Sequence, residues 1–336
     1  MNPLESPAAD RPTVLVLGAN GRFGCAAAQA FDAAGWRVLA QVRCEAAAGM
    51  PQRAVPVRHG LDDTGALVAA AAGARAVVHA VNPIYTRWEE EAMPALRTGL
   101  AVAERLRAHF LLPGNVYNFG AGMPARLHED TPQHPTTRKG EIRVAMEALI
   151  AERSAAAGFA ASVVCGGDFF GAGSGGWFDQ AIVKSLRAGK LVYPGPLDVP
   201  HAWAYLPDMA RATVAVAAQP APRGFARWHF EGHTLTGREL LAALDEAAAS
   251  LGLRPAQGFR IGGMPWGLLR VAGLVVPMWR EFARMSYLWR VPHGLDGTRL
   301  RTLAGSTRID TPIVPALRAS LLGLGFGSQA AAAPAH

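Results

Sequence analysis

The amino-acid sequence predicts an α/β fold in which a doubly wound parallel sheet is joined to a smaller C-terminal substrate lobe. Short apolar runs alternate with helical segments through the first half of the chain, and Gly and Pro loosen this pattern after Gly166. Strict strand–helix alternation implies right-handed crossovers and a parallel sheet with helices on both faces. We therefore expect a sheet domain over 11–170, a lobe over 171–325 with segments allowed to return to the sheet, and flexible termini at 1–10 and 326–336.

The expected elements follow in chain order. The run Thr13–Leu17 (TVLVL) is continuously apolar, as in a strand covered on both faces, and Gly35 lies where the cap of the first helix is expected. The same reasoning predicts strands over 13–17, 38–42, 55–57, 76–81, 110–112 and 160–164, and helices over 26–34, 67–72, 93–108, 138–156, 178–188 and 209–217. The alternation of these segments is what predicts a parallel sheet with helices on both faces.

Composition excludes several classes of protein. The 336 residues are 50% hydrophobic and 18% charged, which excludes a disordered, collagen-like or coiled-coil chain. Lys+Arg 33 against Asp+Glu 26 gives +7, but the arginines are scattered without a basic block, so no nucleic-acid partner is expected. Three cysteines at no metal-ligand spacing, with no targeting segment recognised at the N-terminus, favour a reducing, cytoplasmic location and no metal site.

One apolar stretch, Ile261–Met278, resembles a membrane segment in hydropathy alone. Arg270 and several Gly and Pro residues interrupt it, so we expect a buried or surface-lying helix and no stable membrane insertion. Docking of this stretch on a partner or on a membrane surface is the alternative.

A glycine-rich loop follows the first strand and opens the first helix. Gly18-Ala19-Asn20-Gly21-Arg22-Phe23-Gly24 has the spacing G-x-x-G-x-x-G, in which glycines allow a tight turn, close approach of a pyrophosphate and close helix–strand packing. A strand before the loop, a helix after it and a second strand ending near residue 42 favour dinucleotide binding over an ordinary turn.

The end of the second strand predicts which dinucleotide binds. NAD-preferring sites usually carry a carboxylate there, but this strand ends Ala40-Gln41-Val42-Arg43 with no acid before Glu45. Arg43, helped by Arg22, can instead pair with a 2′-phosphate. Although each could be an ordinary surface arginine, together with the missing acid they favour NADP, with NAD less favoured.

Further motifs extend this reading. They are Asn82-Pro83, Asn115-Val116-Tyr117-Asn118-Phe119-Gly120, Glu129-Asp130-Thr131-Pro132, Gly166-Gly167-Asp168-Phe169-Phe170-Gly171 and Tyr205-Leu206-Pro207-Asp208-Met209-Ala210. With the glycine loop, they make the chain resemble the extended short-chain dehydrogenase/reductases, the NAD(P)-dependent epimerase/dehydratase proteins. The resemblance implies a Rossmann-type NAD(P)-binding domain, hydride transfer, a small-molecule substrate and a homodimer, but it does not name a reaction.

The resemblance also implies a Ser or Thr and a Tyr-x-x-x-Lys pair, and here the sequence differs. Alignment places Lys139 at the tyrosine position and Arg143 at the lysine position, while Pro113-Gly114-Asn115 offers no hydroxyl. Residues four apart share a helix face, and a nearby guanidinium disfavours the ammonium form of Lys139. Lys139 can then replace the tyrosine as general acid or base, as in isoflavone-reductase-like proteins. Alternatively, it contacts the cofactor without catalysis, or it forms a solvated charge ladder with Arg143 and Glu147.

Other side chains complete the expected site. Tyr117 is a second candidate proton donor, although a packed wall is the more ordinary role for such a phenol. By resemblance, Asn82, Pro83 and Asn115 line the cofactor. Tyr85 and Trp88, in a loop, and Asp168 are expected to face the substrate, with simple packing as the alternative for the two aromatic residues.

The sequence as a whole predicts an NAD(P)-dependent oxidoreductase or epimerase/dehydratase-like enzyme acting on a small polar or carbonyl substrate, including sugar-like ones. The alternative is a regulatory protein that senses NADP(H) without catalysis, as NmrA-like proteins do.

Overall fold

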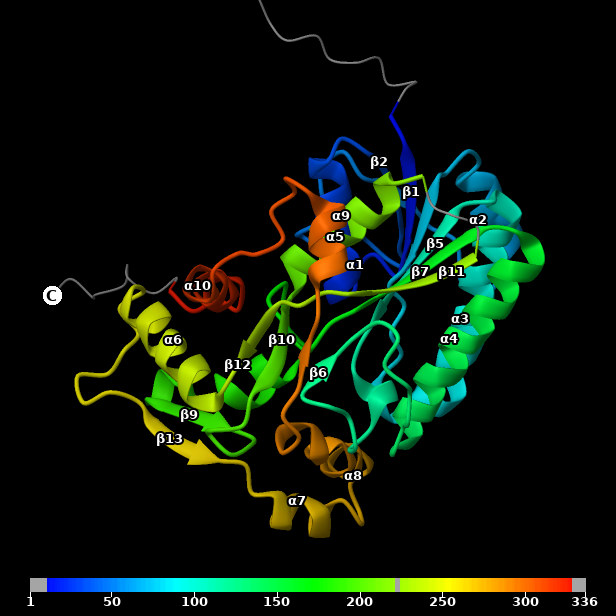
Figure 1. The fold of residues 1–336 in the computed structure, drawn as a ribbon. Coiled ribbons are helices and arrows are strands. Elements are labelled where there is room, and N and C mark those ends of the chain that lie inside the picture. The colour runs from blue at the N-terminus through cyan, green and yellow to red at the C-terminus, as the bar shows by residue number, and fades with distance from the viewer. Residues whose placement is uncertain (1–10, 221–223, 328–336) are drawn as a thin grey trace, which may run out of the picture.

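The computed structural model, which describes residues 11–220 and 224–327, is built on a seven-stranded parallel sheet (Figure 1). Its order is β11-β7-β5-β4-β1-β2-β3, and every neighbouring pair is parallel. The strands are β1 (Thr13–Leu17), β2 (Arg37–Gln41), β3 (Val55–Val57), β4 (Ala76–His79), β5 (His109–Gly114), β7 (Ala160–Cys165) and β11 (Gly224–His229). The predicted doubly wound α/β fold is confirmed. The ends expected to be flexible, 1–10 and 326–336, lie outside the described residues except for 326–327.

The sheet is covered on both faces, as the continuous apolar run of β1 predicts. Leu15 and Leu17 pack into one core, which helices α2, α3 and α4 cover, whereas Val14 and Val16 pack into the other, beneath α1, α5 and α9. These helices are α1 (Arg22–Ala33), α2 (Thr64–Ala70), α3 (Trp88–Leu106), α4 (Arg138–Ala157), α5 (Leu206–Ala218) and α9 (Thr298–Ala304).

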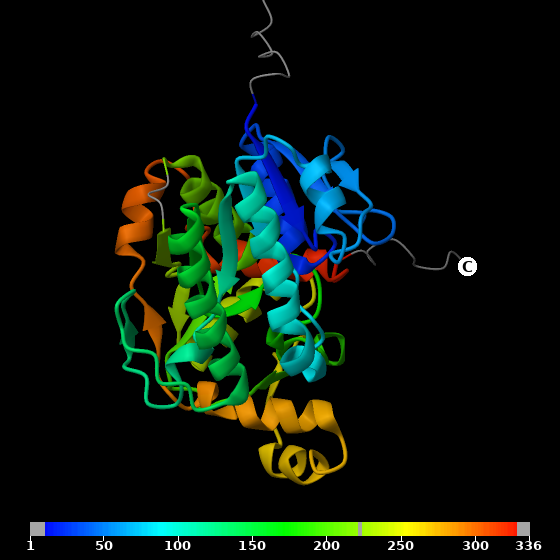
Figure 2. The ribbon, with the colours of Figure 1, turned by 90° about the vertical axis from the view of Figure 1, so that its right-hand side faces the viewer.

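Helix α4 has well-defined ends. The Thr137 side chain accepts a hydrogen bond from the backbone N–H of Gly140, and Gly158 ends the helix with a φ of 69°. Lys139 therefore lies in the first turn and Arg143 one turn later. Figure 2 shows α3 and α4 side by side on one face of the sheet.

The second lobe has its own core and three small sheets. Its elements are β6 (Arg126–Leu127), β8 (Asp168–Phe170), β9 (Lys190–Tyr193), β10 (His201–Tyr205), β12 (His233–Leu235), β13 (Arg260–Gly263), β14 (Gly294–Leu295), α6 (Gly237–Ala249), α7 (Trp266–Ala272), α8 (Pro277–Arg284) and α10 (Ile313–Gly323). Single turns occur at η2 (Tyr85–Arg87), η3 (Tyr117–Phe119), η4 (Phe178–Ile182), η5 (Leu186–Ala188) and η6 (Met285–Trp289).

Two segments from the second half return to the sheet. The predicted helix over 209–217 extends over α5 and packs against α1, because its almost wholly apolar surface is buried there. Strand β11 then pairs with β7 along the edge of the sheet. Its sequence GFARWH carries no apolar run, because an edge strand is only half-buried.

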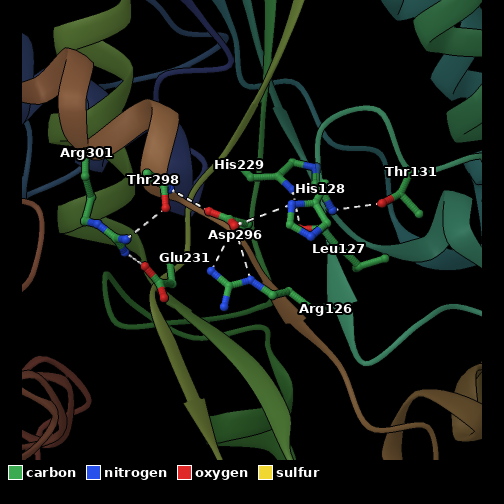
Figure 3. Close-up of polar contacts among 9 residues, drawn as sticks. All are labelled: Arg126, Leu127, His128, Thr131, His229, Glu231, Asp296, Thr298 and Arg301. Carbon is green, nitrogen blue, oxygen red and sulfur yellow. Dashed lines mark hydrogen bonds and ion pairs between the residues drawn. The ribbon is translucent and has the colours of Figure 1, made fainter.

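The outer strands β6 and β14 are held together by a group of polar side chains around Asp296 (Figure 3). Its carboxylate accepts hydrogen bonds from the Arg126 guanidinium at 2.8 Å and from the backbone N–H of Thr298 at 2.9 Å, and it lies 3.4 Å from His128 Nδ1. The hydrogen bonds from Thr298, which have the largest effect, and the one from Arg126 hold the pKa of the Asp296 carboxyl well below its ordinary value. Asp296 thus connects β6, β14 and the start of α9.

Helices α7 and α8 form a hairpin that projects from the body of the molecule (Figures 1 and 2). It occupies most of the apolar stretch Ile261–Met278, which is therefore a surface hairpin preceded by β13 rather than one helix. Among the described residues, no helix combines the length and the apolar character needed to cross a membrane.

Candidate active site

The glycine loop between β1 and α1 has the backbone geometry that a dinucleotide needs. Gly18 has a φ of 72°, which favours glycine. A β-carbon on Gly24 would lie 2.3 Å from the Gly18 carbonyl oxygen, and one on Gly18 would lie 3.0 Å from the backbone nitrogen of Val81. The loop is therefore too tightly folded for side chains at these two positions.

The N-terminus of α1 is left free for an anion. The N-cap is Gly21, which has no side chain to cap the helix, and the first turn contains no acidic residue. The first backbone N–H groups and the helix dipole therefore favour a phosphate at this point. The Phe23 side chain is buried in the core, so only its backbone is available to a cofactor. The loop fits the pyrophosphate of a dinucleotide.

Gln41, at the carboxyl end of β2, and Asn20, in the glycine loop, hold the neighbouring loop segments in place by hydrogen bonds. Gln41 Oε1 accepts a hydrogen bond from the Gly18 N–H at 3.0 Å, and Asn20 holds the following loop through the Glu45 carbonyl at 2.8 Å. The Glu45 carboxylate is exposed and pairs with Arg58. Arg43 is exposed, and within the described chain it has no ion-pair partner.

Arg22 points toward the second lobe. Its guanidinium donates to the carbonyls of Phe169 at 3.4 Å and Gly171 at 3.1 Å, and burial lowers its pKa, partly offset by Asp179. These hydrogen bonds join the start of α1 to the segment after β8, rather than directing Arg22 toward Arg43.

Lys139 and Arg143 are both buried, 4% and 8% exposed, so the expectation of a solvated charge ladder is wrong. Lys139 Nζ donates to Glu281 Oε2 on α8 at 2.5 Å and lies 4.1 Å from the centre of the Tyr85 ring. Glu147 does not neutralise Arg143; it binds Asn118 and Arg227 instead. The first turn of α4 therefore holds the Lys139 amine in the protein interior, where the Glu281 carboxylate is its hydrogen-bond partner.

Arg143 is directed toward the end of β5. Its guanidinium donates to the Pro113 carbonyl at 3.2 Å and lies 4.8 Å from the centre of the Trp88 ring, and burial lowers its pKa. Trp88 is the first residue of α3 rather than part of a loop; it is buried and donates to Asn82 Oδ1 at 3.0 Å. Pro83 follows Asn82 directly and is half-buried.

No hydroxyl is present where the resemblance implies a Ser or Thr. A β-carbon on Gly114 would lie 2.7 Å from the Cys165 sulfur and 2.7 Å from a Val163 methyl group, so the neighbouring side chains leave no room for a side chain there. Asn115 accepts a hydrogen bond from the Tyr117 N–H at 3.2 Å and thus fixes the turn that carries Tyr117.

Tyr85 and Tyr117 meet beside Lys139. Their hydroxyl oxygens are 3.4 Å apart; Tyr117 is buried and Tyr85 is half-buried. Burial raises the pKa of each phenol well above the ordinary value, and the Asp168 carboxylate raises both further. Tyr117 is therefore protonated across the physiological range, and its hydroxyl accepts a hydrogen bond from the Tyr85 hydroxyl.

Asp168 is the electrostatic centre of this cluster. Of the five tyrosines in the chain, the pKa values of four are raised first by burial and also by Asp168; they are Tyr85, Tyr117, Tyr193 and Tyr287. The carboxylate also lies 2.9 Å from His201 Nε2. The hydroxyl of Tyr287 is buried without a hydrogen-bond partner among the described residues.

The sequence did not point to several members of this site. Glu281, Tyr193 and Tyr287 were not singled out, and no role was assigned to His201, which stacks on Trp289 with ring centres 4.3 Å apart. Two signals were available in the sequence. Tyrosine is rare in this chain yet gathers here, and Glu281 is the only acid between Arg260 and Arg290.

Comparisons with known proteins identify the family of the chain. The family model described as the NAD dependent epimerase/dehydratase family matches residues 14–225. No curated protein matches the chain.

Solved structures share the fold. A UDP-glucose 4-epimerase from Thermotoga maritima with UDP-glucose is 14% identical (TM-score 0.71), covering 93% of this chain and 98% of its own. MoeE5 in complex with UDP-glucose and NAD is 16% identical (TM-score 0.67; 93% and 98%). A GalE-like L-threonine dehydrogenase from Cupriavidus necator is 20% identical (TM-score 0.71; 93% and 99%). The family match spans well over half of the sequence and includes the glycine loop, Lys139 and Asp168, so this chain belongs to the NAD-dependent epimerase/dehydratase family.

Proposed function

We propose that this protein is an NADP(H)-dependent oxidoreductase that reduces or oxidises a small polar or carbonyl substrate, including sugar-like ones. The observation that carries the proposal is the buried Lys139 amine over the ring of Tyr85, whose hydroxyl meets that of Tyr117, within a fold whose glycine loop fits a dinucleotide. Aromatic walls with a few converging polar groups are typical of small-molecule sites. The sugar nucleotides in the epimerase and MoeE5 complexes are the kind of substrate that such walls accommodate.

Each group has a separate task. The free N–H groups at the start of α1 hold the pyrophosphate, and Arg43 pairs with the 2′-phosphate. NADP, when bound, supplies or accepts the hydride. Lys139 donates a proton to the substrate oxygen during reduction and takes it back during oxidation, while Tyr117 and Asp168 hold the substrate by hydrogen bonds. Asn82, Pro83 and Asn115, at the ends of β4 and β5, line the cofactor.

Removal of the amine tests the chemistry. Lys139→Met should keep NADPH affinity and lower turnover by about a hundredfold or more, because general acid–base catalysis contributes about that much. Turnover is followed as NADPH oxidation with a panel of aldehydes, ketones and keto sugars. Lys184→Met, which removes an exposed amine, is the matched control and should change neither quantity. Full activity of the Lys139 variant would refute the role of this residue.

The cofactor preference has its own test. Arg43→Asp should weaken NADPH binding about tenfold or more while changing NADH binding little, because a charge-assisted pair to the phosphate is replaced by repulsion. Isothermal titration calorimetry with both nucleotides measures the difference. Arg37→Asp, at the opposite end of the same strand, is the control for added negative charge. Equal losses for both nucleotides would contradict the NADP assignment.

A second function is favoured by two specific observations. The amine of Lys139 is already bonded to Glu281, and Gly114 leaves no room for a catalytic hydroxyl. A protein that senses NADP(H) without catalysis, as NmrA-like regulators do, would have this arrangement. Submicromolar NADP binding without turnover of any substrate in the panel would favour the sensor over the enzyme.

A further inference from the structure

The α7–α8 hairpin carries most of the exposed large hydrophobic side chains of the described chain. Six of the nine lie between residues 261 and 279: Ile261, Leu268, Val271, Leu274, Val275 and Trp279. The most exposed are Leu274 at 83% and Val275 at 85%, in the turn between the two helices. Contiguous exposed apolar surface of this kind marks a binding site, whereas single exposed side chains do not.

The inner side of the same hairpin is anchored to the protein. Glu281 binds Lys139, the Phe282 ring lies 5.1 Å from that of Trp177, and Trp266 Nε1 donates to the Pro194 carbonyl at 2.6 Å. The exposed side chains are therefore on a hairpin held in place from one side. They form an outward-facing apolar tip rather than a loose loop.

The charge around this tip has one sign. Between residues 260 and 290 the chain contains five arginines and a single acid, Glu281, whose carboxylate binds Lys139 and also pairs with Arg284. All five arginines are exposed: Arg260, Arg270, Arg280, Arg284 and Arg290. Apolar side chains in the turn, with exposed Arg270 on α7 and Arg280 on α8 flanking it, match the profile of an anionic membrane surface, with hydrocarbon below and phosphates above.

The alternatives fit less well. Two copies of the chain joined through this tip in a two-fold dimer would bring the same arginines face to face, which is unfavourable. A membrane-spanning role is excluded by length, because α7 has 7 residues and α8 has 8, far below the roughly 20 that cross a bilayer. We infer that the α7–α8 hairpin docks on the surface of an anionic lipid bilayer, inserting Leu274 and Val275 between the headgroups.

The inference is independent of the proposed enzymatic function and is tested on the full chain without substrate. Sedimentation is measured with vesicles of phosphatidylcholine alone and with vesicles of phosphatidylcholine mixed with phosphatidylglycerol. The protein should sediment with the mixed vesicles and much less with phosphatidylcholine alone. Added salt should weaken this binding, because the arginine contribution is screened.

Variants locate the contact. Leu274→Ser with Val275→Ser should lower partitioning about tenfold or more, because burial of two aliphatic side chains is lost. Arg270→Gln with Arg280→Gln should remove the preference for phosphatidylglycerol. Leu322→Ser, at an exposed leucine on α10, is the control and should bind as the unchanged protein does. NADP binding and thermal unfolding of all variants should be unaltered, because these side chains contact solvent.

Three results would overturn the inference. The first is that the protein fails to sediment with either kind of vesicle. The second is that the Leu274/Val275 variant binds vesicles as tightly as the unchanged protein. The third is that vesicle binding is absent and light scattering shows that this variant dissociates a dimer, which would identify the tip as a contact between two copies of the chain.

Discussion

At the scale of single residues, the site depends on how closely the backbone is packed as much as on its charged groups. Gly24 shows this: the first turn of α1 lies against the Gly18 carbonyl so closely that a single methyl group does not fit. The motif spacing predicted this contact from the sequence, because only glycine allows it. The partner of Lys139 could not be predicted in the same way, since Glu281 is 142 residues away along the chain.

Gly24→Ala should therefore abolish dinucleotide binding or lower it about a hundredfold, because the added β-carbon at 2.3 Å from the Gly18 oxygen forces the loop apart. Calorimetric titration with NADPH measures the loss. Gly65→Ala, in α2, is the matched control because its added carbon would make only an ordinary 3.6 Å contact. Unchanged affinity of the Gly24 variant would mean that the pyrophosphate does not bind at this loop.

At the scale of elements, the sequence predicts a helix or a strand well when the residues of that segment themselves determine whether it is buried. In β1, Val14–Leu17 is apolar and buried at every position, and the helix predicted over 138–156 matches α4 almost residue for residue. Strand β11 was not predicted, because an edge strand needs few apolar side chains and its position depends on β7. The same limit applies to the α7–α8 hairpin, because apolar residues occur both on the side that contacts the protein, such as Phe282, and on the exposed side, such as Leu274.

Helix α8 is attached to α4 by the buried pair of Lys139 and Glu281. Glu281→Gln should lower the free energy of unfolding by about 2 to 3 kcal/mol, because it leaves an ammonium group buried without its countercharge. Urea unfolding at neutral pH measures the change. Asp245→Asn, which breaks an exposed pair with Arg254, should cost less than about 1 kcal/mol. The double variant Lys139→Met with Glu281→Leu should recover most of the loss; if it does not, the cost has another origin than the unpaired charge.

At the scale of the whole molecule, three buried histidines make folding sensitive to acid. Burial lowers the pKa of His79 and His109 to about 4 and that of His293 to about 3, and nearby Arg143 and His201 add to the effect at His79 and His293 respectively. In the unfolded chain each titrates near 6.5, so the unfolded state takes up protons first as the pH falls. Their contribution to stability is complete above about 6.5 and is lost progressively below that value.

We expect each of these histidines to remove about 2 kcal/mol of stability between pH 7 and pH 5. Urea unfolding at several pH values should show a steep decline below pH 6.5. His109→Gln, which retains a side chain able to bond Ser162, should reduce the slope by about a third relative to the unchanged protein. An identical slope in this variant would mean that His109 does not titrate on unfolding.

The position of β11 also limits how the protein can move. Two of the connections to the second lobe leave from adjacent strands, after Cys165 at the end of β7 and after His229 at the end of β11, and these two residues are paired in register. Two parallel connections that lie side by side resist a rotation of the second lobe against the sheet, which a single connecting segment would allow. A large swing of one half against the other is therefore disfavoured, and entry of a ligand has to come from local displacement of peripheral segments while the two halves keep their mutual orientation.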